Sequence, residues 1–311
     1  MKQYLLIDIG GTFIKYSLAD EQARKISGGK VPTPLTNMDD LLAVIEGFAA
    51  PLQGQFVGCA ISMPGRIDTR NGIAHTGGML STFMWEQPFA AQVEARLGVP
   101  VTIANDGKCA AAAEGWTGAL AGVENGLVLV LGTGIGGGII LNGKMFNGGM
   151  NHGVELGHAY LVDGGEPCTC GNHGCMEAYC AASALTREGR RAMQAHPESM
   201  LAEKTGSDPA KITPKLVTDC AKAGDPAATA VFDDYIEHLS SACASIYNIL
   251  DPEVLALGGG LSAAGPFLFD PLQDKVSKKC FYSTRGKLVP AVLGNEAGMI
   301  GAALLARDAE A

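Results

Sequence analysis

Glycine-rich segments that could bind a phosphate occur at two places in the chain. The residues concerned are Gly10, Gly11 and Thr12 in the first segment, and Gly132, Thr133 and Gly134 in the second. Without a side chain, glycine lets backbone N–H groups approach phosphate oxygens closely. Asp8 precedes the first segment and could hold the Mg²⁺ that bridges phosphates. Either segment alone is more typical of a tight turn, whereas the pair could grip a triphosphate from two sides.

A second candidate site is the pair Asn105 and Asp106, which lies between an apolar run and an alanine-rich segment. A carboxylate at the start of a helix stays ionised beside the free N–H groups there. One interpretation of Asp106 is helix capping. The other is a general base that accepts a hydroxyl proton during phosphoryl transfer, a reaction that depends chiefly on positioning.

Three cysteines, Cys168, Cys170 and Cys175, lie close together in a loop rich in Gly, Asn, Thr and Pro. This spacing predicts a tetrahedral zinc site that needs one more ligand. The residues themselves leave three candidates for the fourth ligand, which are His158, His173 and Cys180.

Strands and helices are predicted to alternate along the chain. Apolar runs at 4–9 and 13–18 flank the first glycine segment, and runs at 127–131 and 135–141 flank the second, which predicts two β-hairpins with glycine-rich tips. Further strands are predicted at 56–61, 99–104 and 253–257, and helices at 41–48, 90–97, 107–115, 225–250 and 297–306. The alternation predicts an α/β protein whose sheets are covered by helices.

The composition excludes several classes of protein. The 311 residues carry 23 Lys and Arg against 32 Asp and Glu, a net charge of −9, which argues against a nucleic-acid partner. We expect no membrane span and no signal peptide, because no apolar run is long enough. Nine cysteines, most of them scattered, are typical of reduced thiols in a cytoplasmic protein.

With these motifs identified, nearly the whole chain resembles the ROK family of bacterial sugar kinases and repressors. Residues 8–15 (DIGGTFIK) are similar to its N-terminal ATP motif, and residues 131–138 (LGTGIGGG) to its second phosphate loop. Residues 154–158 (VELGH), followed by 168–177 (CTCGNHGCME), resemble its sugar and zinc signature.

The resemblance implies two actin-like (ribonuclease H-like) domains with a ligand cleft between them. We expect residues 1–117 and the C-terminal helix 297–311 to form the N-terminal domain. Residues 118–296 would form a larger C-terminal domain with a zinc-stapled loop. The family often forms dimers, so a homodimer is expected.

The resemblance also implies a role for each candidate residue. Asp106 is expected to be the general base and to contact the sugar. The other sugar-binding candidates are Gly65, Asn105, Glu155, His158 and Glu177. The ATP and Mg²⁺ candidates are Asp8, Gly10, Gly11, Thr12, Gly132, Thr133, Gly134, Gly259 and Gly260. The resemblance selects His158 as the zinc ligand beside Cys168, Cys170 and Cys175. Zinc would be structural and magnesium catalytic.

The expected reaction is ATP-dependent phosphorylation of a hexose, glucose at its 6-hydroxyl being the best single choice. N-acetylmannosamine, N-acetylglucosamine, another hexose or a β-glucoside are alternatives, because residues 73–84 depart from the stretch common in glucokinases. A sugar-sensing regulator without kinase activity is the rival function, although the first predicted strand leaves no room for a preceding DNA-binding segment.

Two basic side chains near these motifs are interpreted as solvent-facing. His75 lies in the variant segment, and Lys15 lies on the strand that follows the first glycine turn.

Overall fold

The computed structural model describes residues 2–76, 80–149 and 154–309. The chain folds into two compact units, each assembled from separate stretches of sequence. The first unit comprises 1–122, 138–154 and 293–311, and the second comprises 123–137 and 155–292.

The first unit is built on a five-stranded sheet with the order β3-β2-β1-β4-β7. Its strands are β1 (Gln3–Ile9), β2 (Phe13–Asp20), β3 (Lys25–Pro32), β4 (Gly58–Met63) and β7 (Val101–Asn105). Strands β1, β2 and β3 form an antiparallel meander, and β4 and β7 extend it in parallel. A short ribbon, β5 (Ile67–Asp68) with β6 (Ile73–Ala74), follows β4.

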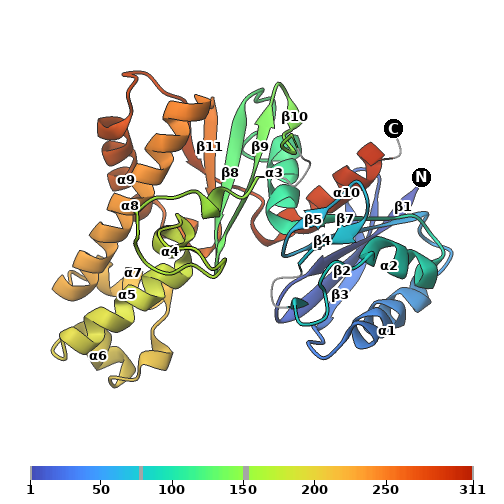
Figure 1. Cartoon of the computed structure of the whole chain (residues 1–311), viewed down its shortest axis with the longest axis horizontal. Helices are drawn as coiled ribbons and strands as arrows, with labels where there is room; N and C mark the ends of the chain where they lie inside the picture. Colours follow the sequence, from blue (N-terminus) through green and yellow to red (C-terminus); the bar gives the residue numbers. More distant parts are fainter. Residues whose placement is uncertain (1, 77–79, 150–153, 310–311) are drawn as a thin grey trace. The chain divides into compact units, whose positions relative to one another are not determined.

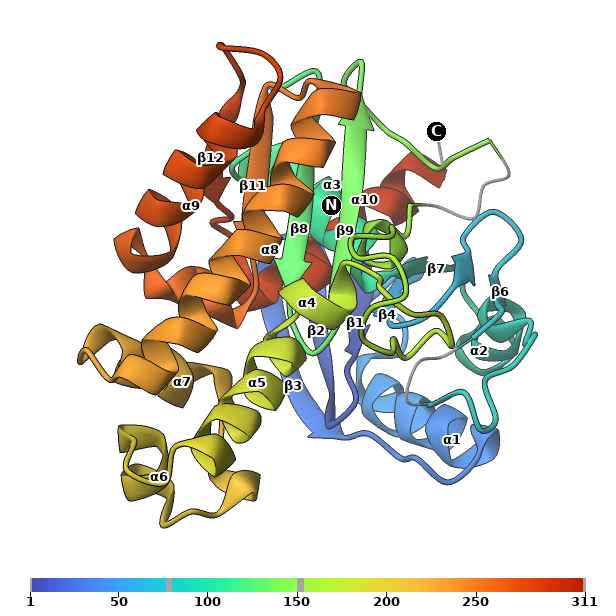
Figure 2. The ribbon, with the colours of Figure 1, turned by 60° about the vertical axis from the view of Figure 1, so that its left-hand side comes forward.

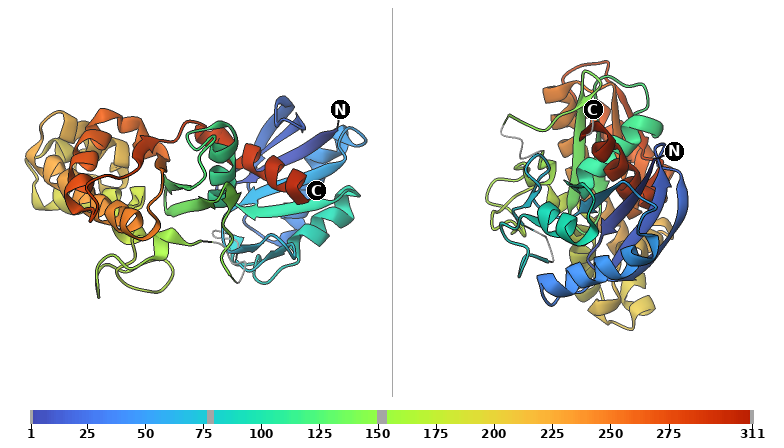
Figure 3. Two further views of the ribbon diagram at one scale, coloured as in Figure 1. Left: turned by 90° about the horizontal axis from the view of Figure 1, so that it is seen from above. Right: turned by 90° about the vertical axis from the view of Figure 1, so that its right-hand side faces the viewer.

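Helices cover both faces of this sheet (Figure 1). Alternate residues of a strand point to opposite faces, so Leu5 and Ile7 join one apolar core while Tyr4 and Leu6 join another. The first core includes residues of α1 (Met38–Ala49) and α2 (Phe89–Leu97). The second includes residues of α3 (Asp106–Thr117) and α10 (Ala297–Ala309). Figure 3 shows α10 lying on the first sheet beside α3.

The second sheet has the order β10-β9-β8-β11-β12. Its strands are β8 (Gly126–Leu131), β9 (Ile135–Leu141), β10 (Lys144–Met145), β11 (Val254–Gly258) and β12 (Lys287–Pro290). The predicted hairpin of β8 and β9 is present, with Gly132–Gly134 at its turn.

Helices of the second unit pack around one long helix, α8 (Pro226–Leu250), which contacts its neighbours along its length (Figure 2). Those neighbours are α4 (Glu177–Cys180), α5 (Ala182–Ala195), α6 (Met200–Thr205), α7 (Pro214–Lys222) and α9 (Pro266–Lys279). Helix α8 begins where the sequence predicts, because Asp225 caps it by accepting a hydrogen bond from Ala228 N–H and Pro226 occupies its first turn.

The compact units differ from the predicted domains at residues 118–122, 138–154 and 293–296, which were expected in the second domain and are grouped with the first unit. The longest of these stretches is 138–154. Packing explains this placement. A Cβ on Gly138 would lie 2.5 Å from the Ala111 methyl group of α3, and Ile140 approaches Gly115 of the same helix. Within the described residues, no helix has the length and apolar content that a membrane span needs.

Candidate active site

Asp8 is held by both strands that flank β1. The register pairs Asp8 with Lys15 on β2 and with Ser62 on β4, so the three side chains lie on one face. Lys15 Nζ lies 3.3 Å from Asp8 Oδ2, and the buried Ser62 hydroxyl donates to Asp8 Oδ1 at 3.0 Å. A Cβ on Gly298 of α10 would lie 2.9 Å from the same Oδ1, so glycine there leaves room for the carboxylate.

Replacing Ser62 with alanine is expected to raise the KM for Mg-ATP by about tenfold, because a hydrogen bond to a charged group is lost from a buried place. Steady-state kinetics with ATP varied would measure this. Ser17→Ala removes another buried hydroxyl from the same sheet, one that donates to Ser27 O, and should leave the KM unchanged. Equal KM values for wild type and Ser62→Ala would show that the hydrogen bond from Ser62 to Asp8 does not contribute to nucleotide binding.

The glycine turn after Asp8 is fixed by backbone and hydroxyl contacts. Gly10 N–H donates to Phe13 O at 3.0 Å, closing the turn. Thr33 donates its hydroxyl to Gly10 O at 2.7 Å and its N–H to Thr12 O at 3.0 Å. The end of β3 therefore holds the turn that carries Gly10, Gly11 and Thr12.

Asn105, rather than Asp106, is the N-cap of α3. Its side-chain oxygen accepts hydrogen bonds from the N–H groups of Gly107 and Lys108, while its Nδ2 donates to Gly65 O at 2.9 Å. Asp106 is the first residue of the helix, is exposed, and accepts from Gly107 N–H at 2.8 Å. Asn105 therefore supplies the cap, and Asp106 adds a first-turn carboxylate whose negative charge suits the N-terminal end of the helix.

Gly65 brings its backbone close to Asn105 in a conformation that suits glycine. Its φ is +103°, and a Cβ there would lie 2.3 Å from Thr76 O. Any larger residue would shift the carbonyl that Asn105 contacts. Gly65, Asn105 and Asp106 are thus a single local arrangement in the first unit, which also contains Asp8.

The glycine turn of the second unit is braced by the start of α5. Ala182 N–H donates to Gly132 O at 2.8 Å, and Ser183 Oγ donates to Thr133 O at 2.6 Å. Gly259, after β11, has a φ of +88°, and a Cβ there would lie 2.3 Å from Leu131 O. The loop that contains Gly259 and Gly260 therefore packs against the strand end that precedes Gly132.

Four candidate metal ligands gather in the second unit. One ligand atom each from His158, Cys168, Cys170 and Cys175 lies within 4.8 Å of the others. Cys170 Sγ lies 3.7 Å from Cys175 Sγ, and Cys168 Sγ lies 3.6 Å from His158 Nδ1. Tetrahedral zinc with Zn–S bonds of about 2.3 Å separates two thiolates by about 3.8 Å, so the donor set fits this metal.

The other two candidates for the fourth ligand lie elsewhere. His173 directs Nδ1 to Gly165 O at 3.1 Å, and Cys180 is buried at the end of α4. Burial raises the pKa of the Cys175 thiol to about 12, so metal binding at neutral pH would have to displace its proton.

Glu177 joins the cysteine loop to the second glycine turn. Its Oε2 accepts from Ile135 N–H at 2.9 Å, and its Oε1 accepts from the Thr169 hydroxyl at 2.8 Å. A Cβ on Gly134 would lie 2.4 Å from Oε2, so this glycine permits the approach. Glu155 is the N-cap of the short helix Leu156–His158, and His158 is its last residue.

Sequence reasoning missed several contacts. Ser62 and Thr169 were not singled out, although a serine inside the buried strand β4 was a usable sign. Lys15 and His75 were interpreted as solvent-facing; the Lys15 side chain is 40% exposed, but the partner of each side chain was missed. Lys15 pairs with Asp8, and His75 Nδ1 lies 2.7 Å from Glu86 Oε2. In the variant segment 73–84, residues 77–79 lie outside the described residues.

The chain has two mixed sheets, and each sheet is covered by helices and contains a hairpin that turns through glycines. This is the architecture of the actin-like class of two-domain ATPases. The chain belongs to the ROK family, whose model matches residues 4–309.

Relatives of known name cover almost the full chain. The glucokinase of Streptomyces coelicolor is 33% identical over 312 residues, 97% of this chain and 96% of that protein. The N-acetyl-D-glucosamine kinase of Vibrio vulnificus is 30% identical over 317 residues, 97% of this chain and 98% of that protein. The crystal structure of a ROK family glucokinase from Streptomyces griseus, in complex with glucose and AMPPNP, has a TM-score of 0.85 and 30% identity. It covers 98% of this chain and 99% of that one.

Proposed function

We propose that this protein is an ATP-dependent hexose kinase that transfers the γ-phosphoryl group to the 6-hydroxyl of glucose. The observation that carries the proposal is Asp106 at the start of α3, beside a neighbour that already caps the helix. Full-length similarity to glucokinases supports the reaction class. N-acetylglucosamine is the alternative acceptor favoured by the similarity to kinases of that sugar.

Asp106 acts as the general base in this mechanism. Its carboxylate accepts the proton of the sugar hydroxyl as the oxygen attacks the γ-phosphorus and the bond to the β-phosphate oxygen breaks. The N-terminal end of α3 favours the ionised form before reaction. Asn105 and the Gly65 backbone hold the neighbouring hydroxyls, with Glu155, His158 and Glu177 as the other sugar contacts.

The nucleotide site uses the two glycine turns and the Gly259 loop. Asp8 would hold Mg²⁺ directly or through water, and the ion would neutralise charge on the transferring phosphate. Ser62 orients the Asp8 carboxylate, and Lys15 adds positive charge beside it. The backbones of Gly10, Gly11 and Thr12, of Gly132, Thr133 and Gly134, and of Gly259 and Gly260 would line the phosphates.

Zinc has a structural role in this proposal. His158, Cys168, Cys170 and Cys175 would hold it, which fixes the orientation of the His158 ring for its sugar contact. We propose further that the protein is a cytoplasmic homodimer and has no nucleic-acid partner. Light scattering in solution would test the dimer.

A sugar panel tests the proposed acceptor. Purified protein with Mg-ATP is expected to release ADP fastest with glucose, and more slowly with N-acetylglucosamine, N-acetylmannosamine, mannose, fructose and β-glucosides. A higher kcat/KM for N-acetylglucosamine than for glucose would identify N-acetylglucosamine as the preferred acceptor. No ADP release with any of them would overturn the proposed function.

A further inference from the structure

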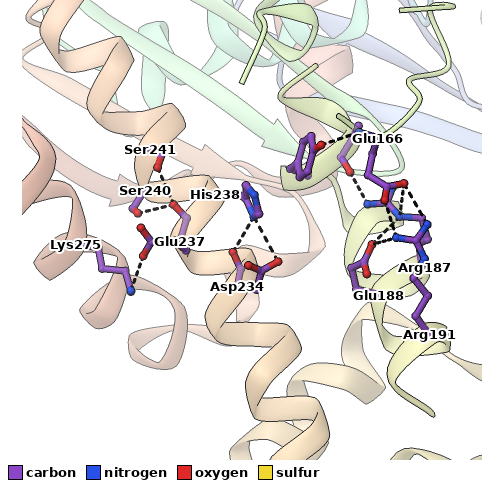
Figure 4. A network of polar contacts seen from close by, with 12 residues as sticks. Glu166, Arg187, Glu188, Arg191, Asp234, Glu237, His238, Ser240, Ser241 and Lys275 are labelled. Atoms are coloured by element: carbon purple, nitrogen blue, oxygen red, sulfur yellow. Dashed lines mark hydrogen bonds and ion pairs between the residues drawn. The ribbon is translucent and has the colours of Figure 1, made fainter. Parts of the chain in front are cut away.

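The cysteine loop is tied to helix α5 by an ion pair outside the metal cluster (Figure 4). Arg191 holds Glu166 with two parallel contacts, Nη1 to Oε1 at 2.7 Å and Nη2 to Oε2 at 3.2 Å. Arg187 Nε lies 3.7 Å from the same carboxylate, and Glu188 accepts from both arginines. Two parallel N–H···O bonds fix the direction of the carboxylate as well as its position.

The backbone of Glu166 is held as well. Its N–H donates to the Tyr179 hydroxyl at 2.7 Å, and its carbonyl accepts from Gly174 N–H at 2.8 Å. The Tyr179 ring stacks on His238 of α8, with ring centroids 4.6 Å apart. A Cβ on Gly165 would lie 1.9 Å from the Tyr179 hydroxyl, so the loop approaches the helices as closely as a glycine allows.

Charged side chains also surround this attachment. A cavity of about 150 Å³ beside the network is lined by Glu166, Arg187, Glu188, Arg191, Asp234 and His238, among others.

The attachment lies next to the residues that hold Glu177. Cys168 and Thr169 follow Glu166 closely in the chain, and both contact Glu177 Oε1, at 3.6 Å and 2.8 Å. The other oxygen of Glu177 accepts from Ile135 N–H. Thr169 lies three residues after Glu166, so a displacement of the loop at Glu166 would also move the hydroxyl that Glu177, a candidate sugar contact, accepts from.

We propose that Glu166 is a positioning residue, which Arg191 holds so that the loop presents the Thr169 hydroxyl to Glu177. This inference rests on the proposed function for its effect on sugar binding. Its structural part, the anchoring of the loop, is independent of that function.

Hydrogen exchange and kinetics test the two parts separately. In Glu166→Gln and in Arg191→Met, the amides of Cys168 and Gly174 are expected to exchange about threefold to tenfold faster than in wild type. The KM for glucose should rise by a similar factor of about threefold to tenfold, with kcat and the KM for ATP unchanged. Arg191→Lys keeps the charge but lacks the fork, so it should restore part of the protection.

Glu237→Gln is the matched control, because Glu237 on α8 pairs with Lys275 on α9 at 2.6 Å (Figure 4). Among the described residues, its side chain forms no hydrogen bond or ion pair with the cysteine loop. It should leave loop exchange and the glucose KM unchanged. Unaltered exchange in both Glu166→Gln and Arg191→Met would overturn the anchor. Faster exchange without a change in the glucose KM would overturn the positioning role. If wild type phosphorylates no sugar, the proposed function fails, while the exchange rates still decide on the anchor.

Discussion

Replacing Asp106 with asparagine is expected to lower kcat by about 10²–10⁴-fold, the range typical of a positioned general base. Asparagine has nearly the same shape but accepts no proton at neutral pH. The helix should survive the change, because Asn105 supplies the cap of α3. The KM for glucose and the melting temperature should therefore remain close to those of wild type.

Stopped enzyme assays with saturating Mg-ATP and glucose would measure this loss. Asp39→Asn is the matched control, since Asp39 also lies in the first turn of a helix and its side chain is almost fully exposed. That variant should retain wild-type kcat. A kcat for Asp106→Asn within about twofold of the wild-type kcat would show that Asp106 is not the general base.

Cys175→Ser is expected to lose the bound zinc and to raise the KM for glucose by more than about tenfold. Cys175 is buried, and its Sγ lies 3.7 Å from Cys170 Sγ. Without the metal, the loop would lose the bond that orients His158 and the support that Thr169 gives Glu177. The KM for ATP should rise less, because the first glycine turn has its own contacts to Thr33.

Metal analysis of freshly purified protein gives the direct readout, with about one zinc per chain expected in wild type. Cys280→Ser is the control, since Cys280 is a half-buried cysteine outside the cluster. It should keep both zinc and activity. Wild-type protein that contains no zinc would refute the metal site, even if Cys175→Ser were inactive for other reasons.

The elements around the site could be predicted where sequence patterns are local. The two glycine hairpins and the long helix from Pro226 follow from apolar runs, glycines and a capping aspartate. Strand β3 was not predicted, because its sequence KISGGKVP is polar and mostly exposed. It forms by pairing with β2, which a search for apolar runs does not reveal.

Details of the site depended on tertiary structure. Asparagine and aspartate are equally good caps, so the sequence could not tell which of Asn105 and Asp106 ends up at the N-cap position. The spacing of the cysteines also left His158, His173 and Cys180 open as the fourth ligand, and Cys180 is buried at the end of α4. The fold of the loop separates them, because His173 contacts Gly165 O while His158 approaches Cys168.

The placement of residues 138–154 with the first unit had a similar cause. Strand β9 continues past Gly137 as the sequence predicts, but Gly138 and Ile140 pack on α3. Small residues at 111 and 115 allow that approach, and no local pattern in the strand indicates its partner.

The most direct test of the proposed kinase is to identify the product formed from Mg-ATP and glucose. Phosphorus NMR of the reaction mixture is expected to show ADP and glucose 6-phosphate in equal amounts with wild type, and to show both forming at least about 100-fold more slowly with Asp106→Asn. ADP without a sugar phosphate, or no ADP from wild type at all, would contradict the proposed function.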